Sequence, residues 1–541
     1  MVAYLSFIDE LAYVNVHFGT EFTYRRISMS HLKHIRVLAP LTAFLIVITI
    51  LATARGVLVH AAPSPVLVSG VSPYASCLNA GEPGTNYVNA EVEPYVAVNP
   101  TTVGTANVNL IGVWQQDRWN NGGAHGLVAG FSFDGGTSWG ETTLPFSACA
   151  PNAILDPFTG APYDRASDPW VSIGPDGTAY AIGLLATNNT NSGNNDTGVA
   201  TVTSSDGGKT WDNQRLIKSD KGTSPVFEFT QFFNDKESIT ADPIHGGTAY
   251  VVWDRLKAPS HSPDAALRAH AFRGPTWFSK TTDGGKTWTG TRAIFDPGQN
   301  SQTIGNQVVV NRQTGVLYDF FELFQTTGSP NFIPRGLSVG FISSSDGGSI
   351  WSKPTVVSNQ QTVNDFAPNT GALLRTGAGL PSVAIDASNG DLYVVWEDAR
   401  FTVGTVNQVV ISTSTNGGTT WNGPAVVSNP NSKPAFTPMV AVNSGSTVAV
   451  TYYDFRNPDG STVGQPTDYW FTSSTDHGAS FGNETRITPT SFDILNAPNA
   501  GGLFLGDYEG LDVNGTAFVP FFVQTNGEDK SNRTNVFTMS I

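Results

Sequence analysis

The chain has 541 residues and a formal net charge of −15, although only 13% of its residues are charged. This balance argues against a nucleic-acid partner, because binding a phosphate backbone needs a basic surface stripe. The 56 glycines and 33 prolines, together with many short apolar runs, favour an all-β protein rich in turns.

Residues 1–62 are predicted to be an N-terminal extension that contains an export signal. A basic patch at residues 31–36 precedes an apolar run at residues 37–54, and small residues follow the run. The run has the minimum length for a membrane span, so a cleaved signal peptide and an uncleaved anchor both stay open. Met29 is an alternative start to Met1. In each case the remainder is expected outside the cytoplasm, either secreted or membrane-anchored, with the membrane contacted only by the N-terminal segment.

The chain has two cysteines, Cys77 and Cys149, which is too few for a disulfide framework or a multi-cysteine metal site. One disulfide in an oxidising compartment and two free thiols are both open alternatives. The nine histidines show no metal-ligand spacing, so no cofactor is predicted. The acidic loops at residues 194–196 and 457–460 are interpreted as turns, with a Ca²⁺ site as the alternative.

One short pattern recurs six times between residues 132 and 481: Ser or Thr, any residue, Asp, Gly, Gly, two residues, Trp. The fifth copy has Asn in place of Asp, and the sixth ends in Phe and has His for the first Gly. The pattern predicts a tight turn, because Asp or Asn can bond nearby backbone N–H groups and Gly supplies a positive φ. The Asp or Asn positions are Asp134, Asp206, Asp283, Asp346, Asn416 and Asp476.

These turns resemble the Asp box, or BNR repeat, of sialidases and related proteins. The resemblance implies a β-propeller over residues 63–541, in which the Asp-box residues are structural. Six apolar segments of first-strand character precede the six turns and a seventh follows the last turn, so we predict seven four-stranded blades, with six as the alternative because sialidases have six. The last unit lacks a fourth strand, and a strand near residues 65–69 is expected to complete it and close the ring.

In such a ring, the start of each first strand and the end of each second strand meet at one opening, which we call the mouth. The Asp boxes are expected at the opposite end. Polar residues gather at the predicted mouth, and non-repeating ones are the better functional candidates. The recurring Asp and Arg pairs are also open to interpretation as salt bridges between blades. The predicted substrate-binding residues are Arg255, Arg400, Arg456, Arg118, Asp235, Lys236, Asp507 and Trp170.

The sialidase resemblance implies roles for several of these residues. Arg255, Arg400 and Arg456, with Arg118 as a spare, would bind a substrate carboxylate. Tyr508 would be the nucleophile, paired with Glu237 or Glu509, and Asp168 would be the general acid/base. The chain departs from the family at the first inner strand, where Glu93-Pro94 replaces the expected Arg-Ile-Pro.

The sequence therefore predicts an extracytoplasmic, sialidase-like glycoside hydrolase that acts on terminal glycan residues. The alternatives are a non-catalytic propeller that binds glycan or protein at the cell surface, and a lyase or other polysaccharide-acting enzyme. The expected partner is a glycan or glycoconjugate, and a monomer is predicted.

Overall fold

The computed structural model describes residues 5–8, 11–14, 64–77, 84–187, 196–221, 232–257, 273–326, 334–429, 433–457, 464–482 and 484–541. The chain divides into two compact units, Met1–Ala62 and Pro63–Ile541. In the first, strand β1 (Leu5–Ile8) pairs antiparallel with β2 (Leu11–Val14). Met29 and the apolar run at residues 37–54 lie outside the described residues, as do Asn194 and residues 458–460 of the two acidic loops. No described helix is both long and apolar enough to cross a membrane.

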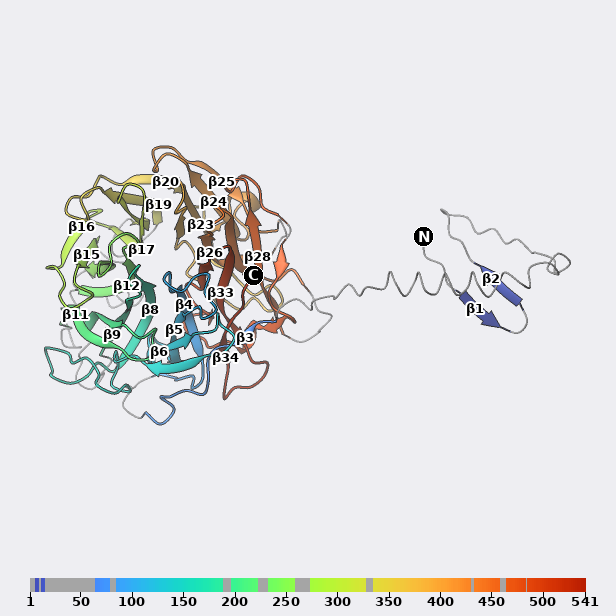
Figure 1. Cartoon of the computed structure of the whole chain (residues 1–541), viewed down its shortest axis with the longest axis horizontal. Coiled ribbons are helices and arrows are strands. Elements are labelled where there is room, and N and C mark those ends of the chain that lie inside the picture. The colour runs from blue at the N-terminus through green and yellow to red at the C-terminus, as the bar shows by residue number, and fades with distance from the viewer. Residues whose placement is uncertain are drawn as a thin grey trace. The chain divides into compact units, whose positions relative to one another are not determined.

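The second unit is all-β, as predicted: apart from two 3-10 helices, η2 (Arg400–Thr402) and η3 (Ile494–Asn496), its described elements are strands. The strands form successive antiparallel groups of four, arranged around an axis (Figure 1). The first three groups are β4 (Glu91–Val98), β5 (Leu110–Arg118), β6 (Ala124–Ser132) and β7 (Gly140–Thr143); β8 (Arg165–Ile173), β9 (Ala179–Ala186), β10 (Thr197–Ser204) and β11 (Asp212–Asp220); and β12 (Phe232–Ala241), β13 (Ala249–Lys257), β15 (Thr276–Thr281) and β16 (Arg292–Phe295).

The next groups are β17 (Ser301–Val310), β18 (Leu317–Thr326), β19 (Pro334–Ser344) and β20 (Thr355–Asn359); β22 (Ser382–Ile385), β23 (Leu392–Asp398), β24 (Gln408–Ser414) and β25 (Asn422–Val426); and β26 (Ala435–Val442), β27 (Val448–Asp454), β28 (Pro466–Ser474) and β29 (Thr485–Arg486). The last contains β32 (Gly510–Asn514), β33 (Ala517–Thr525), β34 (Thr534–Thr538) and, from the other end of the unit, β3 (Val66–Leu67). Four short strands lie between them: β14 (Arg273–Gly274), β21 (Leu374–Arg375), β30 (Phe492–Asp493) and β31 (Leu503–Phe504).

The second strands of the groups are deeply buried, since both of their faces meet neighbouring sheets. Every residue of β5 is buried, and so is every residue of β23 and β27. Trp114, Trp253 and Trp396 are each the fifth residue of their strands, β5, β13 and β23, and are fully buried. These strands therefore read as near-continuous apolar runs rather than as alternating patterns.

The Asp boxes form the turns between third and fourth strands. In the first, Asp134 Oδ1 accepts hydrogen bonds from the Ser138 N–H (2.9 Å) and the Ser132 hydroxyl (2.8 Å). Gly135 and Gly136 have φ values of 71° and 91°, which are strained for other residues. Asp206, Asp283, Asp346, Asn416 and Asp476 accept equivalent bonds in the other boxes.

Five of the first strands carry a β-bulge near their start. The register of β4 shifts between Val92 and Tyr95, and that of β8 between Ser167 and Trp170, with equivalent shifts in β12, β17 and β26. The bulges hold Glu93, Asp168 and Lys236 in the left-handed region, with φ values of 52°, 51° and 47°. Bulges re-aim side chains, and left-handed non-glycine residues are characteristic of functional sites.

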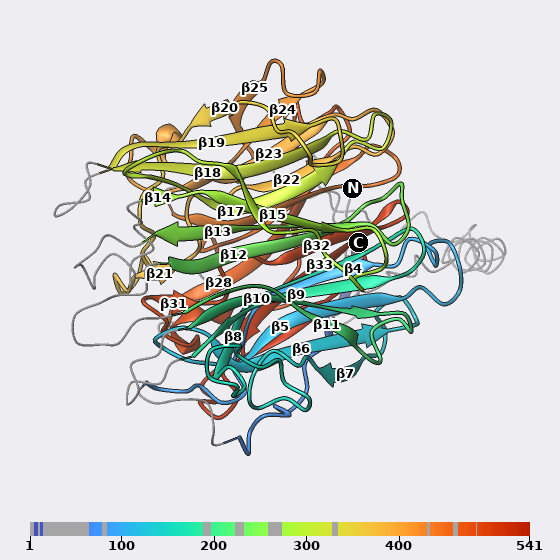
Figure 2. The same ribbon diagram turned by 90° about the vertical axis from the view of Figure 1, so that its left-hand side faces the viewer.

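The strand register separates the two ends of the second unit. Glu91 at the start of β4 pairs with Gln116 at the end of β5, whereas Val98 pairs with Leu110, which in turn pairs with Ser132 of the first Asp box. The bulges and the ends of second strands therefore share one end, the mouth, and the Asp boxes lie at the other. In Figure 2 the mouth, with β21 and β31, lies on the left.

Candidate active site

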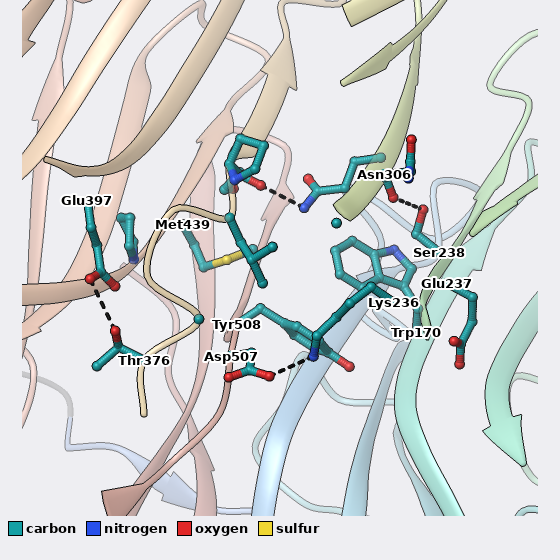
Figure 3. A pocket seen from close by; sticks show the side chains of 17 residues that line it. Trp170, Lys236, Glu237, Ser238, Asn306, Thr376, Glu397, Met439, Asp507 and Tyr508 are labelled. Atoms are coloured by element: carbon teal, nitrogen blue, oxygen red, sulfur yellow. Dashed lines mark hydrogen bonds and ion pairs between the residues drawn. The ribbon is translucent and has the colours of Figure 1, made fainter. Parts of the chain in front are cut away.

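A buried ion cluster centred on Lys236 lies at the mouth. The Lys236 ammonium is 2.7 Å from Asp507 Oδ2, 3.2 Å from Glu93 Oε1 and 3.5 Å from Asp168 Oδ2. Glu93, Asp168 and Lys236 come from the bulges of β4, β8 and β12, and Asp507 precedes β32. The three bulges thus direct one cation and two carboxyl groups to the same point. Figure 3 shows Lys236 beside Asp507 and Tyr508.

The cluster separates the pKa values of its carboxyl groups. Burial acts to raise the pKa of Asp168, but the Lys236 ammonium and a hydrogen bond from Ser167 (2.7 Å) outweigh it, so the pKa lies below its ordinary value. At Asp507, burial again acts to raise the pKa, but the positive charges of Arg375 and Lys236 outweigh it. The pKa of Asp507 therefore lies well below its ordinary range. Both groups are ionised at neutral pH.

Two neighbouring carboxyl groups shift in the other direction. Burial, followed by the negative charge of Asp168, raises the pKa of Asp235 to about 7. Burial raises the pKa of Glu93 to about 8 against the opposing charge of Lys236. Asp235 is partly exposed, whereas Glu93 is fully buried. A carboxyl group that solvent reaches and that keeps its proton up to about neutral pH therefore lies near an ionised carboxylate.

Arg375, which the sequence reasoning missed, completes the cluster. Its Nε and Nη2 donate to the two oxygens of Asp507 at 3.0 and 2.6 Å, and its guanidinium lies 4.4 Å from the centre of the Phe504 ring. Arg375 belongs to residues 360–381, between β20 and β22, which we call the strap. This segment lies outside the repeated strand pattern, so the repeat gave no signal for it.

The strap is fixed to several parts of the mouth. Its strand β21 pairs in parallel with β31, and the Val363 N–H donates to Asn407 Oδ1 at 3.0 Å. The Thr376 hydroxyl donates to Glu397 Oε2 at 3.1 Å. These bonds hold Arg375 over Asp507.

The aromatic residues predicted at the mouth form its floor. Tyr508 donates a hydrogen bond to the Pro169 carbonyl (2.9 Å), and no described Glu accepts its hydroxyl proton. Trp170 stacks on Tyr95 with ring centres 3.6 Å apart and lies 5.2 Å from the Tyr508 ring. Burial raises the pKa of Tyr508 well above its ordinary value, so the phenol is neutral. The structure therefore does not bring Tyr508 into the expected pair with Glu237 or Glu509.

Those two glutamates lie apart from Tyr508's hydroxyl and are themselves buried. Neither carboxyl oxygen of Glu237 has a hydrogen-bond partner among the described residues, and burial raises its pKa well above the ordinary value. Glu509 accepts a hydrogen bond from the Val523 N–H (3.1 Å), while the Tyr453 hydroxyl donates to the Val523 carbonyl (2.7 Å). The structure thus places Glu509 against the Val523 backbone, at a depth that solvent does not reach.

The three arginines expected to act together share no partner. Arg255 Nε donates to Asp220 of the preceding group at 2.8 Å, and Arg400 pairs with Asp398 of its own strand end at 2.8 Å. Arg456 contacts Asp454 and Glu484, with Nη2 3.0 Å from Glu484 Oε1. Each guanidinium is occupied locally, so the expected triad is not assembled.

Arg118, the spare candidate, is the member of that set nearest the cluster. Its Nη1 donates to Gln115 (2.6 Å), Gln115 in turn contacts Glu93, and its guanidinium lies 4.9 Å from the Phe504 ring that also contacts Arg375. Arg118 is 2% exposed, and burial lowers its pKa to about 10.

A narrow cavity of about 30 Å³ runs beside the cluster. It is lined by Lys236, Glu237, Glu397, Asp507 and Tyr508, among others (Figure 3). This volume admits a few water molecules and is far below the roughly 300 to 1,000 Å³ of ligand pockets. A sugar would therefore lie above the cluster rather than within the axis. The part of the chain that the structure describes holds no group of three or more side chains suited to a metal ion.

No family model matches the chain, and no curated protein matches it. Among solved structures, the chain is similar to a Penicillium chrysogenum alpha-L-arabinanase complexed with arabinobiose (13% identity, 88% of this chain and 98% of that chain, TM-score 0.41). It is also similar to a Hadza microbial sialidase (13%, 81% and 74%, TM-score 0.42) and to a protein of unknown function from Dyadobacter fermentans (13%, 88% and 99%, TM-score 0.44). These likenesses are too weak to assign an activity.

Proposed function

We propose that the chain is a glycoside hydrolase whose reaction takes place at the mouth. The observation that carries this proposal is the divergence of two neighbouring carboxyl groups, Asp235 with a pKa of about 7 and Asp168 with a lowered pKa. Environments that push two pKa values apart are characteristic of acid and base pairs.

The two groups would divide the reaction between them. Asp235, protonated and partly exposed, would donate a proton to the glycosidic oxygen of the leaving group. Asp168, held ionised by Lys236, would act as the base or nucleophile on the sugar. Asp507 and Lys236 would be positioning residues, because they act through Asp168 rather than on the substrate.

We further propose that the second unit is a seven-bladed propeller that β3 closes. The pairing of Val66 with Thr538 and of Leu67 with Phe537 supports this closure. An extracytoplasmic location is supported by the disulfide between Cys77 and Cys149, because disulfides persist in oxidising compartments.

A second candidate function is glycan or protein binding without catalysis. The local pairing of Arg255, Arg400 and Arg456 and the narrow axial cavity favour it, since neither leaves a deep pocket for a substrate. Under this interpretation the Lys236 cluster would only fill the centre of the ring of strands and would have no role in catalysis.

A panel of chromogenic and fluorogenic glycosides, including a sialoside, tests the two candidates. The hydrolase proposal predicts turnover of at least one glycoside by the purified chain and its loss in the Asp235→Asn variant. Turnover that Asp235→Asn and Asp168→Asn both retain would contradict the assigned roles. Glycan binding with no turnover of any glycoside would favour the second candidate.

A further inference from the structure

We propose that the mouth takes an uncharged glycan rather than an acidic one. This inference rests on the proposed function, because it assigns a substrate class to the same mouth. It follows from how the described cations of the Lys236 cluster and the arginines at three second-strand ends are neutralised.

Arg375 is the most exposed guanidinium of the Lys236 cluster, with 35% of its side chain accessible. Its bidentate pair with Asp507 uses the geometry with which an arginine would otherwise bind a substrate carboxylate. The ion pair carries no net charge, so Arg375 offers an acidic sugar little attraction.

The other described arginines at the ends of second strands are neutralised in the same way. Arg255 pairs with Asp220, Arg400 with Asp398, and Arg456 with both Asp454 and Glu484. A substrate carboxylate would have to displace one of these carboxylates, and each arginine would lose a charge-assisted bond for the one it gained.

Two described cations beside Arg375 lie below the surface of the mouth. Lys236 is 9% exposed and contacts three carboxyl groups, and Arg118 is 2% exposed behind Glu93. Asp235 is a partly exposed carboxyl group beside the cluster and becomes an anion as the pH rises through about 7. An acidic sugar would therefore meet a neutral or negative surface on a chain of net charge −15.

An uncharged sugar still finds hydrogen-bond partners here. Arg375 gives one N–H bond to the Ala500 carbonyl (3.2 Å) and two to Asp507, and a guanidinium carries further N–H donors. Those donors suit hydroxyl and ring oxygens, which need no counter-charge. Arg375, its charge balanced by Asp507, thus acts as a hydrogen-bond donor at the rim.

A matched pair of ligands tests the inference: a neutral hexoside oligosaccharide and the hexuronoside that differs from it only by a carboxylate at C6. A sialoside serves as a third ligand. Binding is measured by calorimetry with the full chain at low and at high salt. We expect the neutral member to bind at least about tenfold more tightly, with an affinity that salt leaves unchanged, because screening acts on charged partners. Tighter binding of the hexuronoside or the sialoside, weakening with salt, would overturn the inference.

The Asp507→Asn variant provides a second arm, because it removes the counter-charge of Arg375. This variant is expected to bind the hexuronoside about tenfold or more tightly than the native chain does. Asp398→Asn, which frees Arg400 beside the strap, serves as the matched control at a different site. No gain in Asp507→Asn, in protein whose melting curve shows a folded state, would contradict the role given to the Asp507 charge. The native chain's salt dependence decides the inference if this variant does not fold.

The outcomes also separate this inference from the proposed hydrolase. Binding of the neutral ligand without turnover of any glycoside would reject hydrolysis and keep the substrate class. Hydrolysis confined to acidic glycosides would keep the hydrolase and reject the substrate class. Binding of neither ligand class would reject both.

Discussion

Individual residues form the ion cluster at the mouth, and the sequence singled out most of them without their environments. Asp168, Asp235, Lys236 and Asp507 could be selected because each stands at a strand entry and none belongs to the repeat. Their pKa values could not be predicted, since these depend on groups far away in the chain. The pKa of Asp507, for example, is lowered by Arg375, which lies 132 residues away in the chain.

The Asp235→Asn substitution tests the acid role. A general acid contributes roughly 10²- to 10⁴-fold, so kcat is expected to fall by that order. In the native chain, activity should decline as the pH rises through about 7, because Asp235 loses its proton there. This alkaline limb should be absent from the variant, and the pH dependence of kcat checks it. Asp212→Asn, at an exposed position, is the control; an alkaline limb that persists in Asp235→Asn would contradict the role.

The stability of the fold should also depend on pH through Glu93. Its pKa is raised from 4.5 to about 8, so the folded state holds the proton more tightly than the unfolded chain. The stabilisation is complete below about 4.5 and is lost as the pH rises through about 8. Denaturant unfolding should show this decline in the native chain and a flatter dependence in Glu93→Gln. Parallel pH profiles for the two proteins would exclude Glu93 as the source.

Among the elements, the strap is the part that sequence reasoning could not place. The Asp boxes and first strands repeat, so their register and their ends were predictable from one copy to the next. The strap occurs once, and its position is set by tertiary contacts such as the parallel pairing of Leu374 with Leu503. No local pattern encodes such a contact.

Two glycines of the strap form a matched test of its position. Gly377 and Gly371 both have positive φ, 65° and 70°, so an alanine is similarly strained at each. A Cβ at Gly377 would collide with the backbone of Asp507, whereas one at Gly371 meets open space. Gly377→Ala should therefore weaken glycan binding about tenfold or more, and Gly371→Ala should cost only about 1 kcal/mol of stability. Equal effects of the two substitutions on binding would contradict the placement of the strap against Asp507.

The Asp boxes are expected to affect stability alone. Asp346 accepts hydrogen bonds from the Ser349 and Ile350 N–H groups, and Asn416 accepts the Thr420 N–H bond in the fifth box. Asp346→Ala should lower the melting temperature by a few degrees, whereas Asp346→Asn should not, because an amide oxygen accepts the same bonds. Activity per folded molecule should be unchanged in both. Loss of activity in folded Asp346→Ala would argue that the box end takes part in function.

At the scale of the whole molecule, the sequence predicted an all-β chain, which the structure confirms, and an N-terminal strand that pairs with the last one. Val66 and Leu67 could be proposed for this role because the last unit lacked a fourth strand. The Cys77–Cys149 disulfide could not be decided from sequence, because it depends on a Cα separation of 5.6 Å between residues 72 positions apart.

Reduction of that disulfide should destabilise the second unit. The bond closes a loop of 72 residues, for which chain entropy predicts a loss of about 4 kcal/mol. Thermal melts with and without reductant measure the effect, and the Cys77→Ser/Cys149→Ser double variant should melt alike in both. Native protein whose melting is insensitive to reductant would contradict a stabilising role.

The position of a bound sugar tests the central claim most directly. A crystal structure of the Asp235→Asn variant soaked with the neutral oligosaccharide is predicted to show the sugar over the Lys236 cluster, with a glycosidic oxygen within hydrogen-bonding distance of residue 235 and a hydroxyl bonded to Arg375. A sugar bound instead in the groove between β25 and β29, beside Phe481 and Glu484, or at the Asp-box end, would contradict the account.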